Sequence, residues 1–136
     1  MERVLGRFSP QFYALMRIAV GLLFACHGAQ KLFGLFGGQH VPLASMFGLA
    51  GIIEFVGGLM IAIGFLTGTV AFIASGEMAY AFFTAHLPRG PVPIQNGGEL
   101  AVLYCFVFLF IVFYGPGWLS LDAMIFRARA ANVAAP

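Results

Sequence analysis

The sequence predicts an all-α membrane protein that folds as a bundle of four transmembrane helices. Of its 136 residues, 61% are hydrophobic and 9% are charged, whereas about a quarter of the residues in an ordinary soluble domain carry charge. Seven Lys and Arg together with five Asp and Glu are too few to cover a globule that faces water. This composition excludes a disordered chain, a nucleic-acid-binding protein and an ordinary cytosolic enzyme. It indicates that the lipid bilayer is the solvent.

Four apolar segments follow one another along the chain, and each crossing of a bilayer needs about 20 such residues. The expected spans are 11–33, 44–66, 68–87 and 98–118. Segments rich in Gly and Pro separate the first span from the second and the third from the fourth, which is typical of loops. The joint at Thr67 is much shorter, so we expect the second and third spans to form an antiparallel hairpin. We expect residues 1–136 to form one integral membrane domain.

The positive charges at the ends of the spans predict the orientation of the bundle, because Lys and Arg are enriched in cytoplasmic segments. One side carries Arg3, Arg7, Arg17, Arg127 and Arg129, and the other carries Lys31 and Arg89. We therefore expect both termini to be cytoplasmic. The first apolar run is too long for a cleavable signal peptide and contains Arg17, so it is expected to be a retained helix.

Several ionisable side chains fall inside the predicted spans, where they are costly and usually functional. At a rise of about 1.5 Å per residue, Arg17, Glu77, Glu54 and His27 lie roughly 9, 13, 17 and 24 Å above the cytoplasmic boundary of a core of roughly 30 Å. Arg17 is the only strong cation at mid-depth, and Glu77 or Glu54 could form a bidentate pair with it. The remaining carboxyl could then transfer protons or bind a polar ligand head. The alternative is that these charges only hold the helices together.

A second polar cluster is expected near the outer ends of the spans. It comprises His27, Gln30 and Lys31 on one side of the first span, His86 at the end of the third, and Asn96 and Glu99 at the start of the fourth. These groups could hydrogen-bond the oxygens of a quinone-like or anionic small molecule above an apolar cavity. The alternative is interfacial anchoring, in which Lys31 reaches the lipid headgroups and Glu99 complements the helix dipole.

Other chemistry is less well supported by the sequence. His27 and His86 lie at similar heights and could in principle ligate haem, but the charged groups around them disfavour it. No zinc-binding helix, phosphate-binding loop or dinucleotide fingerprint occurs, so we expect no metal site. The glycines Gly28, Gly57 and Gly58 are expected to allow close helix packing.

Four fragments of the chain carry a family resemblance. They are RIAVGLLFACHGAQKLFG at 17–34, IEFVGG at 53–58, NGGELAVLY at 96–104 and GPGWLSLD at 115–122. In this order they resemble the DoxX family of small four-helix bacterial inner-membrane proteins. The family pattern marks Arg17, His27, Gly28, Lys31, Glu54, Gly57, Gly58 and Glu99, to which depth and chemistry add Glu77 and His86.

The resemblance implies a multi-pass protein of the bacterial inner membrane. The family includes the membrane subunit of thiosulfate:quinone oxidoreductase, members linked to quinone or thiol oxidative stress, and members that associate with redox proteins. This chain has nothing outside the predicted bundle that could hold a redox centre, so any enzymatic activity would need a second subunit.

The sequence therefore favours a membrane subunit of a redox system that binds a quinone or another lipophilic molecule. In this hypothesis His27, Lys31 and Glu99 orient the ligand head, while Glu54, Glu77 and Arg17 handle charge or protons. One alternative is a non-catalytic assembly or scaffold subunit of a larger membrane complex, and another is a transporter of a small solute or protons. The expected partners are the lipid bilayer and a protein subunit or further copies of the chain, with no nucleic acid.

Overall fold

A computed structural model describes residues 5–126, and every regular element in this part of the chain is a helix. The first long helix, α2 (Ser9–Phe33), follows a short 3-10 turn, η1 (Gly6–Phe8). The second runs without a break through α3 (Met46–Ile52), the π-helical segment η2 (Ile53–Gly57) and α4 (Gly58–Ile63). Arg3, Arg127 and Arg129, which contribute to the predicted orientation, lie outside the described residues.

The second half of the chain forms another long helix and a shorter one that returns beside it. The third helix comprises α5 (Thr67–Ala81), the π-helical segment η3 (Phe82–His86) and the 3-10 turn η4 (Leu87–Arg89). A single short helix, α6 (Pro93–Asn96), precedes the last long element, α7 (Glu99–Tyr114).

Three of these helices are long and apolar enough to cross a membrane, namely Gly6–Phe33, Met46–Ile63 and Thr67–Arg89. The fourth predicted span is shorter than expected, because α7 has 16 residues and would measure about 24 Å at the usual helical rise. It ends at Gly115, whose φ of 89° stops the helix before Pro116. The sequence predicts a span that reaches residue 118, because apolar residues occur beyond that point. The all-helical, membrane-type fold is confirmed, while the fourth crossing stays a prediction.

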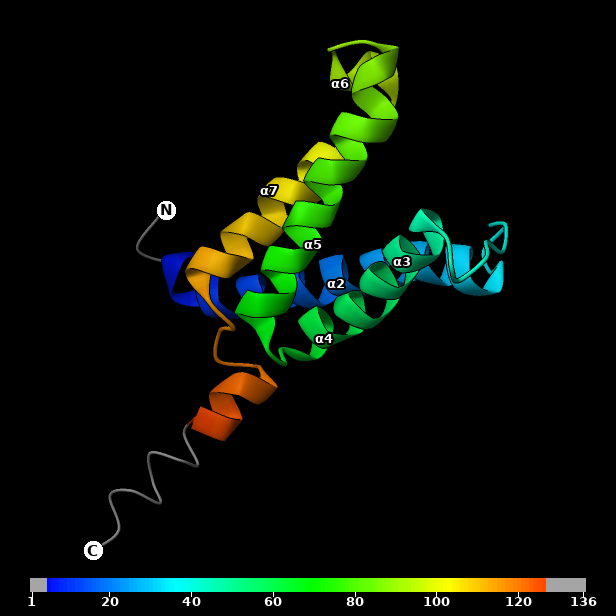
Figure 1. Cartoon of the computed structure of the whole chain (residues 1–136). Helices are drawn as coiled ribbons and strands as arrows, with labels where there is room; N and C mark the ends of the chain where they lie inside the picture. Colours follow the sequence, from blue (N-terminus) through cyan, green and yellow to red (C-terminus); the bar gives the residue numbers. More distant parts are fainter. Residues whose placement is uncertain (1–4, 127–136) are drawn as a thin grey trace, which may run out of the picture.

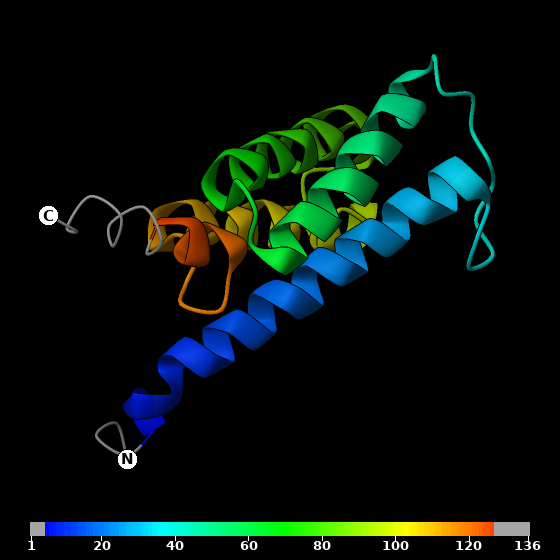
Figure 2. The same ribbon diagram turned by 90° about the horizontal axis from the view of Figure 1, so that it is seen from below.

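The helices are arranged as two pairs (Figures 1 and 2). In one pair α2 packs along α3, η2 and α4, and in the other α5 packs along α7. The turn between α4 and α5 is as short as predicted, but the two helices diverge beyond it, so they do not form a close hairpin along their whole length (Figure 1). Each of them makes its most extensive contacts with a different helix.

Glycines bring the helices of the first pair close together. A Cβ atom added to Gly58 would lie 2.5 Å from the carbonyl oxygen of Gly21, and one added to Gly21 would lie 2.6 Å from the carbonyl oxygen of Gly58. One helical heptad further along, Gly28 faces the backbone of Gly51 and Phe55 in the same way. Side chains at these positions would push the two backbones apart, and such small-residue contacts are a common basis for helix association in lipid.

Arg17 is fully buried and joins three segments of the chain. Its guanidinium donates to the carbonyl oxygens of Ile61 at 2.5 Å and Ala62 at 2.7 Å, and also to that of Leu119. The expectation that Arg17 pairs with Glu77 or Glu54 is therefore wrong. The carbonyl oxygen of Ile61 also accepts from the N–H of Gly64 at 3.1 Å. In a bilayer no water replaces a missing donor, so the guanidinium supplies donors to backbone oxygens at the end of α4 and at Leu119.

Asp122 binds the start of α5, next to the joint at which Arg17 connects three segments of the chain. Its carboxylate accepts hydrogen bonds from the backbone N–H of Leu66 at 2.9 Å and from the N–H and hydroxyl of Thr67, both at 2.8 Å. Burial works against ionisation of Asp122, but these hydrogen bonds outweigh it and hold the pKa of the carboxyl below its usual value. Leu66 has a φ of 48°, a left-handed conformation that is costly for a branched side chain, and its bond to Asp122 stabilises this turn.

Substitution of Gly58 by Ala is expected to destabilise the fold by about 1–3 kcal/mol, because the added methyl group would collide with the backbone of α2. Gly68→Ala is the matched control, since nothing lies within 4 Å of a Cβ at that position. Chemical or thermal unfolding in detergent would measure both changes. Equal effects of the two substitutions would contradict the close packing of α2 and α4.

Replacement of Arg17 by Gln should reduce the folded yield and the melting temperature, because the carbonyls of Ile61, Ala62 and Leu119 would lose the guanidinium donor. A buried carbonyl left without any donor costs about 1–3 kcal/mol, and the Ile61 oxygen keeps the N–H of Gly64. Arg7 is exposed and supplies the control, Arg7→Gln, which is expected to melt close to the wild-type temperature. Size-exclusion chromatography and melting curves in the same detergent would compare them. An Arg17→Gln protein with wild-type stability would show that the joint does not depend on the guanidinium.

Candidate functional site

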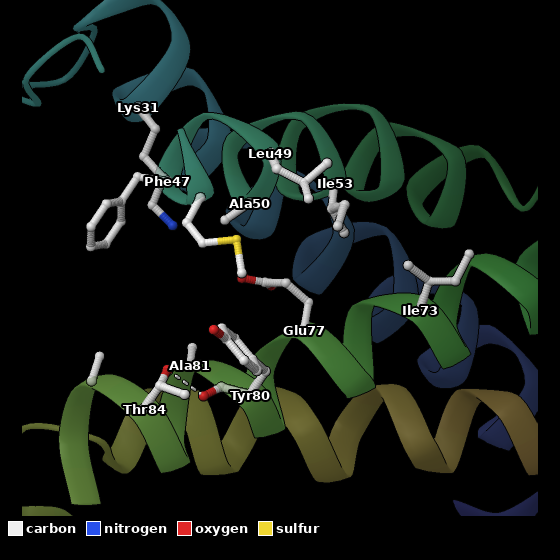
Figure 3. A pocket seen from close by; sticks show the side chains of 12 residues that line it. Lys31, Phe47, Leu49, Ala50, Ile53, Ile73, Glu77, Tyr80, Ala81 and Thr84 are labelled. Carbon is white, nitrogen blue, oxygen red and sulfur yellow. Dashed lines mark hydrogen bonds between the residues drawn. The ribbon is translucent and has the colours of Figure 1, made fainter. Parts of the chain in front are cut away.

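A cavity lies where the two helix pairs diverge, between α3 and η2 on one wall and α5 and η3 on the other (Figure 3). It has a volume of about 560 Å³, within the usual range for small-molecule sites. Its lining is mostly apolar and consists of Met46, Phe47, Leu49, Ala50, Ile53, Ile73, Tyr80, Ala81, Thr84 and Ala85, together with Lys31 and Glu77. Figure 3 shows Lys31 and Glu77 reaching into this space from opposite walls.

The ammonium group of Lys31 forms an ion pair with the carboxylate of Glu54. The distance from Lys31 Nζ to Glu54 Oε1 is 2.5 Å, and Glu54 is only 2% exposed. The intramembrane carboxylate is therefore paired with the cation at the end of α2 and not with Arg17. The Lys31 ammonium is therefore directed to Glu54. In the alternative considered from the sequence, it would reach the lipid headgroups instead.

Two of the predicted site residues lie in π-helical turns. Glu54 belongs to η2 and His86 to η3. A π turn adds a residue to the helical repeat, which changes the direction of the side chains on it, and such turns occur frequently at functional sites. The local sequence gives no signal for either turn, so the pairing of Glu54 could not be read from helical periodicity.

A smaller cavity of about 250 Å³ adjoins the first and shares Lys31, Phe47, Ala81 and Ala85 with it. Its other lining residues include Phe24, His27, Glu54, His86 and Tyr104.

The rings of His27 and Tyr104 meet edge to face with centroids 6.0 Å apart, and His86 Nδ1 lies 3.3 Å from the carbonyl oxygen of Asn96. The structure thus brings His27, Lys31, Glu54 and His86 around one space.

The other three residues of the predicted outer cluster lie elsewhere. Gln30 donates to the carbonyl oxygen of Phe36 at 3.2 Å. The Asn96 amide donates to the Gly90 carbonyl and accepts from the Gly98 N–H, both at 2.7 Å. Glu99 is exposed beside a separate surface pocket at the start of α7. The two amides hold their own loops together, and neither cavity includes Gln30, Asn96 or Glu99.

Two carboxylate oxygens in these cavities are buried without a hydrogen-bond partner in the described part of the chain. They are Glu54 Oε2 and Glu77 Oε2. Buried polar atoms are normally hydrogen-bonded, and an exception needs an explanation. Both oxygens belong to residues that line a cavity, but the two oxygen atoms themselves are buried.

Aromatic residues make up the part of the site that the sequence did not indicate. Phe47, Tyr80 and Tyr104 line the cavities, but the chain contains 16 Phe and 4 Tyr, and no periodic signal separates them from lipid-facing rings. Within residues 5–126, no group of three or more His, Cys, Asp and Glu side chains is placed to hold a metal ion.

Comparisons with known proteins agree with the resemblance in the sequence. The model of the DoxX family matches residues 12–87. An uncharacterized protein of Haemophilus influenzae is 41% identical over 130 residues, covering 90% of this chain and 97% of the relative. A Bacillus subtilis protein named "Putative oxidoreductase CatD" is 26% identical over 128 residues, covering 89% of this chain and 92% of the relative. No solved structure matches the chain.

Removal of one partner of the ion pair should be more harmful than removal of both. Lys31→Met leaves the buried Glu54 carboxylate without its cation and is expected to cost about 3–5 kcal/mol, whereas the double variant Lys31→Met, Glu54→Met should recover most of that loss. A double-mutant cycle measured by unfolding in detergent gives the coupling energy. Additive effects of the two single substitutions would contradict the pairing.

Proposed function

Since this chain belongs to the DoxX family, we propose that it is a multi-pass protein of the bacterial inner membrane that binds a quinone or another lipophilic small molecule. In this proposal it acts as the membrane subunit of a redox system, and a partner subunit supplies the redox centre. The name of the Bacillus subtilis relative, "Putative oxidoreductase CatD", supports the link to redox chemistry.

The observation that carries the proposal is the cavity of about 560 Å³ between α3–η2 and α5–η3. Its walls are apolar and a few polar groups converge on it, which is the usual composition of a site for a lipophilic ligand. A quinone presents a ring, an apolar tail and two carbonyl oxygens that accept hydrogen bonds. The ammonium of Lys31 and the hydroxyl of Tyr80 line the cavity and are suitable donors for those oxygens.

A bound quinone would supply the chemistry of a two-electron, two-proton carrier. The part of this chain in that chemistry would be to bind the ring, to orient its oxygens and to hold protons nearby. Glu77 is suited to hold a proton, because its Oε2 atom is buried at the cavity and has no partner among the described residues. Lys31 and Glu54 would keep the polar end of the cavity fixed.

The proposed topology has four crossings with both termini in the cytoplasm. Helix α7 packs along α5 and has apolar residues throughout after Glu99, which supports its assignment as the fourth crossing. A helix of 16 residues can be accommodated by local thinning of the bilayer. Arg7, at the start of the first long helix, is on the side that the distribution of positive charge assigns to the cytoplasm.

Binding of a decyl-substituted benzoquinone, in its oxidised and reduced forms, tests the proposal in purified protein reconstituted into nanodiscs. We expect at least one form to raise the melting temperature in a concentration-dependent way. Ala50→Phe should weaken binding about tenfold or more by filling the larger cavity, and Glu77→Gln should change the affinity without loss of folded protein.

Ala19→Phe is the matched control for the cavity-filling variant, because Ala19 is exposed and lines neither cavity. It should bind like the wild type. Failure of the wild-type protein to bind either form, or unchanged binding by Ala50→Phe, would count against a ligand site in this cavity.

A further inference from the structure

We propose that the smaller cavity is a blind aqueous vestibule, through which water and the protons that it carries reach Lys31 from the end of the bundle at α6. The larger cavity receives its ligand from the bilayer, and the two cavities share the Lys31 side chain. The role given to the vestibule rests on the proposed function, because a ligand head at Lys31 is what exchanges protons with this water. The hydration itself is tested without a ligand.

The smaller cavity lies on the axis of the bundle, whereas the larger cavity lies on its flank. All four long helices contribute to the smaller one, through Phe24 of α2, Glu54 of η2, Met78 of α5 and Tyr104 of α7. Apart from Lys31, the larger cavity is lined by two helices only, α3 with η2 and α5 with η3. The two cavities therefore open toward different surroundings.

The larger cavity opens to the side of the bundle. Its lining residues Leu49, Ile73 and Tyr80 are half-exposed, and they lie on helices that are long and apolar enough to cross a membrane. An opening of this kind suits a ligand that is dissolved in the bilayer. Hydrocarbon supplies no protons, however, so protons for a ligand head at Lys31 have to arrive from water by another route.

The smaller cavity opens at the end of the bundle near α6. Its exposed lining residues Gly97 and Leu100 lie where α6 gives way to α7, and His86 comes from the end of the third long helix. The largely exposed segment 90–98 contains irregular backbone, with positive φ at Gly90 and Gly97. Irregular backbone exposed to lipid does not occur within the hydrocarbon region, so this segment and the mouth of the cavity lie at the aqueous surface.

Polar side chains continue from this mouth into the cavity. His86, His27 and Lys31 line it and are partly exposed, so water that enters can reach them. The Lys31 ammonium has three N–H groups, one of which is directed to Glu54. A buried water needs a polar site with about two to four partners and enough room, and a volume of about 250 Å³ is many times the space that one molecule needs. The cavity therefore has both the room and the polar groups to hold water.

Aromatic rings close the deep end of the smaller cavity. The ring of Phe24 packs against Tyr104 at a centroid distance of 5.4 Å and against Phe108 at 4.7 Å. Phe108 is fully buried, and the apolar core continues from it through Ile61 and Ile111. This core separates the cavity from the opposite end of the bundle. A blind vestibule fits a subunit that takes up protons from one surface, and it disfavours the alternative of a transporter.

Reaction of an introduced thiol with iodoacetate tests for water in the cavity. The experiment uses the purified protein in nanodiscs, with Cys26 and Cys105 replaced by Ala. Iodoacetate is a small anion that does not dissolve in hydrocarbon, and the thiolate is the form of Cys that reacts. Met78→Cys places the thiol at the wall of the cavity and at the midpoint of the helix Thr67–Arg89. Mass spectrometry of the intact protein follows the rate of modification.

Gly76→Cys is the matched control, because Gly76 is on the same helix, is exposed, lines neither cavity and has space for a Cβ atom. Met78 is only 7% exposed, so exposure alone predicts that the thiol at position 76 reacts faster. We expect the opposite, with Met78→Cys modified about tenfold or more faster, because a thiol in apolar surroundings stays protonated.

A second pair of variants serves if Met78→Cys fails to fold. Ala101→Cys places the thiol on the α7 wall of the smaller cavity. Its control is Val102→Cys at the neighbouring position, which is more exposed and lines neither cavity. We expect Ala101→Cys to be modified faster than Val102→Cys.

Cavity-filling substitutions assign the route that iodoacetate takes. In the Met78→Cys protein, Ala101→Leu narrows the smaller cavity and should abolish most of the reaction. Ala50→Phe fills only the larger cavity and should leave the rate unchanged.

The outcomes separate the two proposals. Equally slow modification of Met78→Cys and Gly76→Cys, both folded, would show that the cavity is dry and overturn the vestibule, while the binding test with the decyl-substituted benzoquinone stands apart from it. Protection by Ala50→Phe and not by Ala101→Leu would overturn the entrance at α6. Fast modification of Met78→Cys together with no binding of either quinone form would overturn the proposed function and support the vestibule.

Discussion

The rest of the structure depends on one constraint, because backbone carbonyls in a bilayer must find hydrogen-bond donors within the protein. The guanidinium of Arg17 is such a donor. It binds carbonyl oxygens at the end of α4 and at Leu119, and Asp122 caps the start of α5 close by. These bonds join the two helix pairs at the α4–α5 turn, in addition to the apolar core that both pairs share. Beyond this joint they diverge (Figure 1), and the divergence creates the space in which the cavities lie.

The charged side chains in the spans and next to them consequently divide into two groups with different tasks. Arg17 and Asp122 bind backbone groups and stabilise the joint. Lys31, Glu54 and Glu77 lie at the walls of the cavities, with two carboxylate oxygens that lack partners among the described residues. Depth in the membrane alone predicts that Arg17 pairs with a carboxylate. The helical rise gives the height of a residue, but it does not show which neighbour the side chain reaches. On α2, Arg17 at the joint and Lys31 at the cavities therefore lie at different positions along the helix.

The sequence predicted the helices well and their partners poorly. The first helix was expected at 11–33 and is Ser9–Phe33, because apolar composition over 20 or more residues is a strong signal. Hydropathy does not detect the helix end at Gly115, so the sequence predicts a last helix that is too long. The sequence identified His27, Lys31 and His86 as polar groups near one end. It could not show that Gln30 and Asn96 are used by their own loops, since such bonds depend on loop conformation, nor that π turns at Glu54 and His86 change the helical repeat.

The ion pair between Lys31 and the buried Glu54 is explained better by the proposed ligand site than by stability. A buried pair of charges gives little net stability, since desolvation offsets most of the attraction, and an apolar pair of similar size often serves as well. Helices α2 and α4 already pack closely through Gly21 and Gly58, so they do not need Lys31 and Glu54 to associate. What an apolar pair could not provide is a polar end for the cavities, both of which Lys31 lines and one of which Glu54 lines. Polar groups among apolar walls orient the head of a lipophilic ligand, so the proposed ligand site gives Lys31 and Glu54 a chemical reason to lie together.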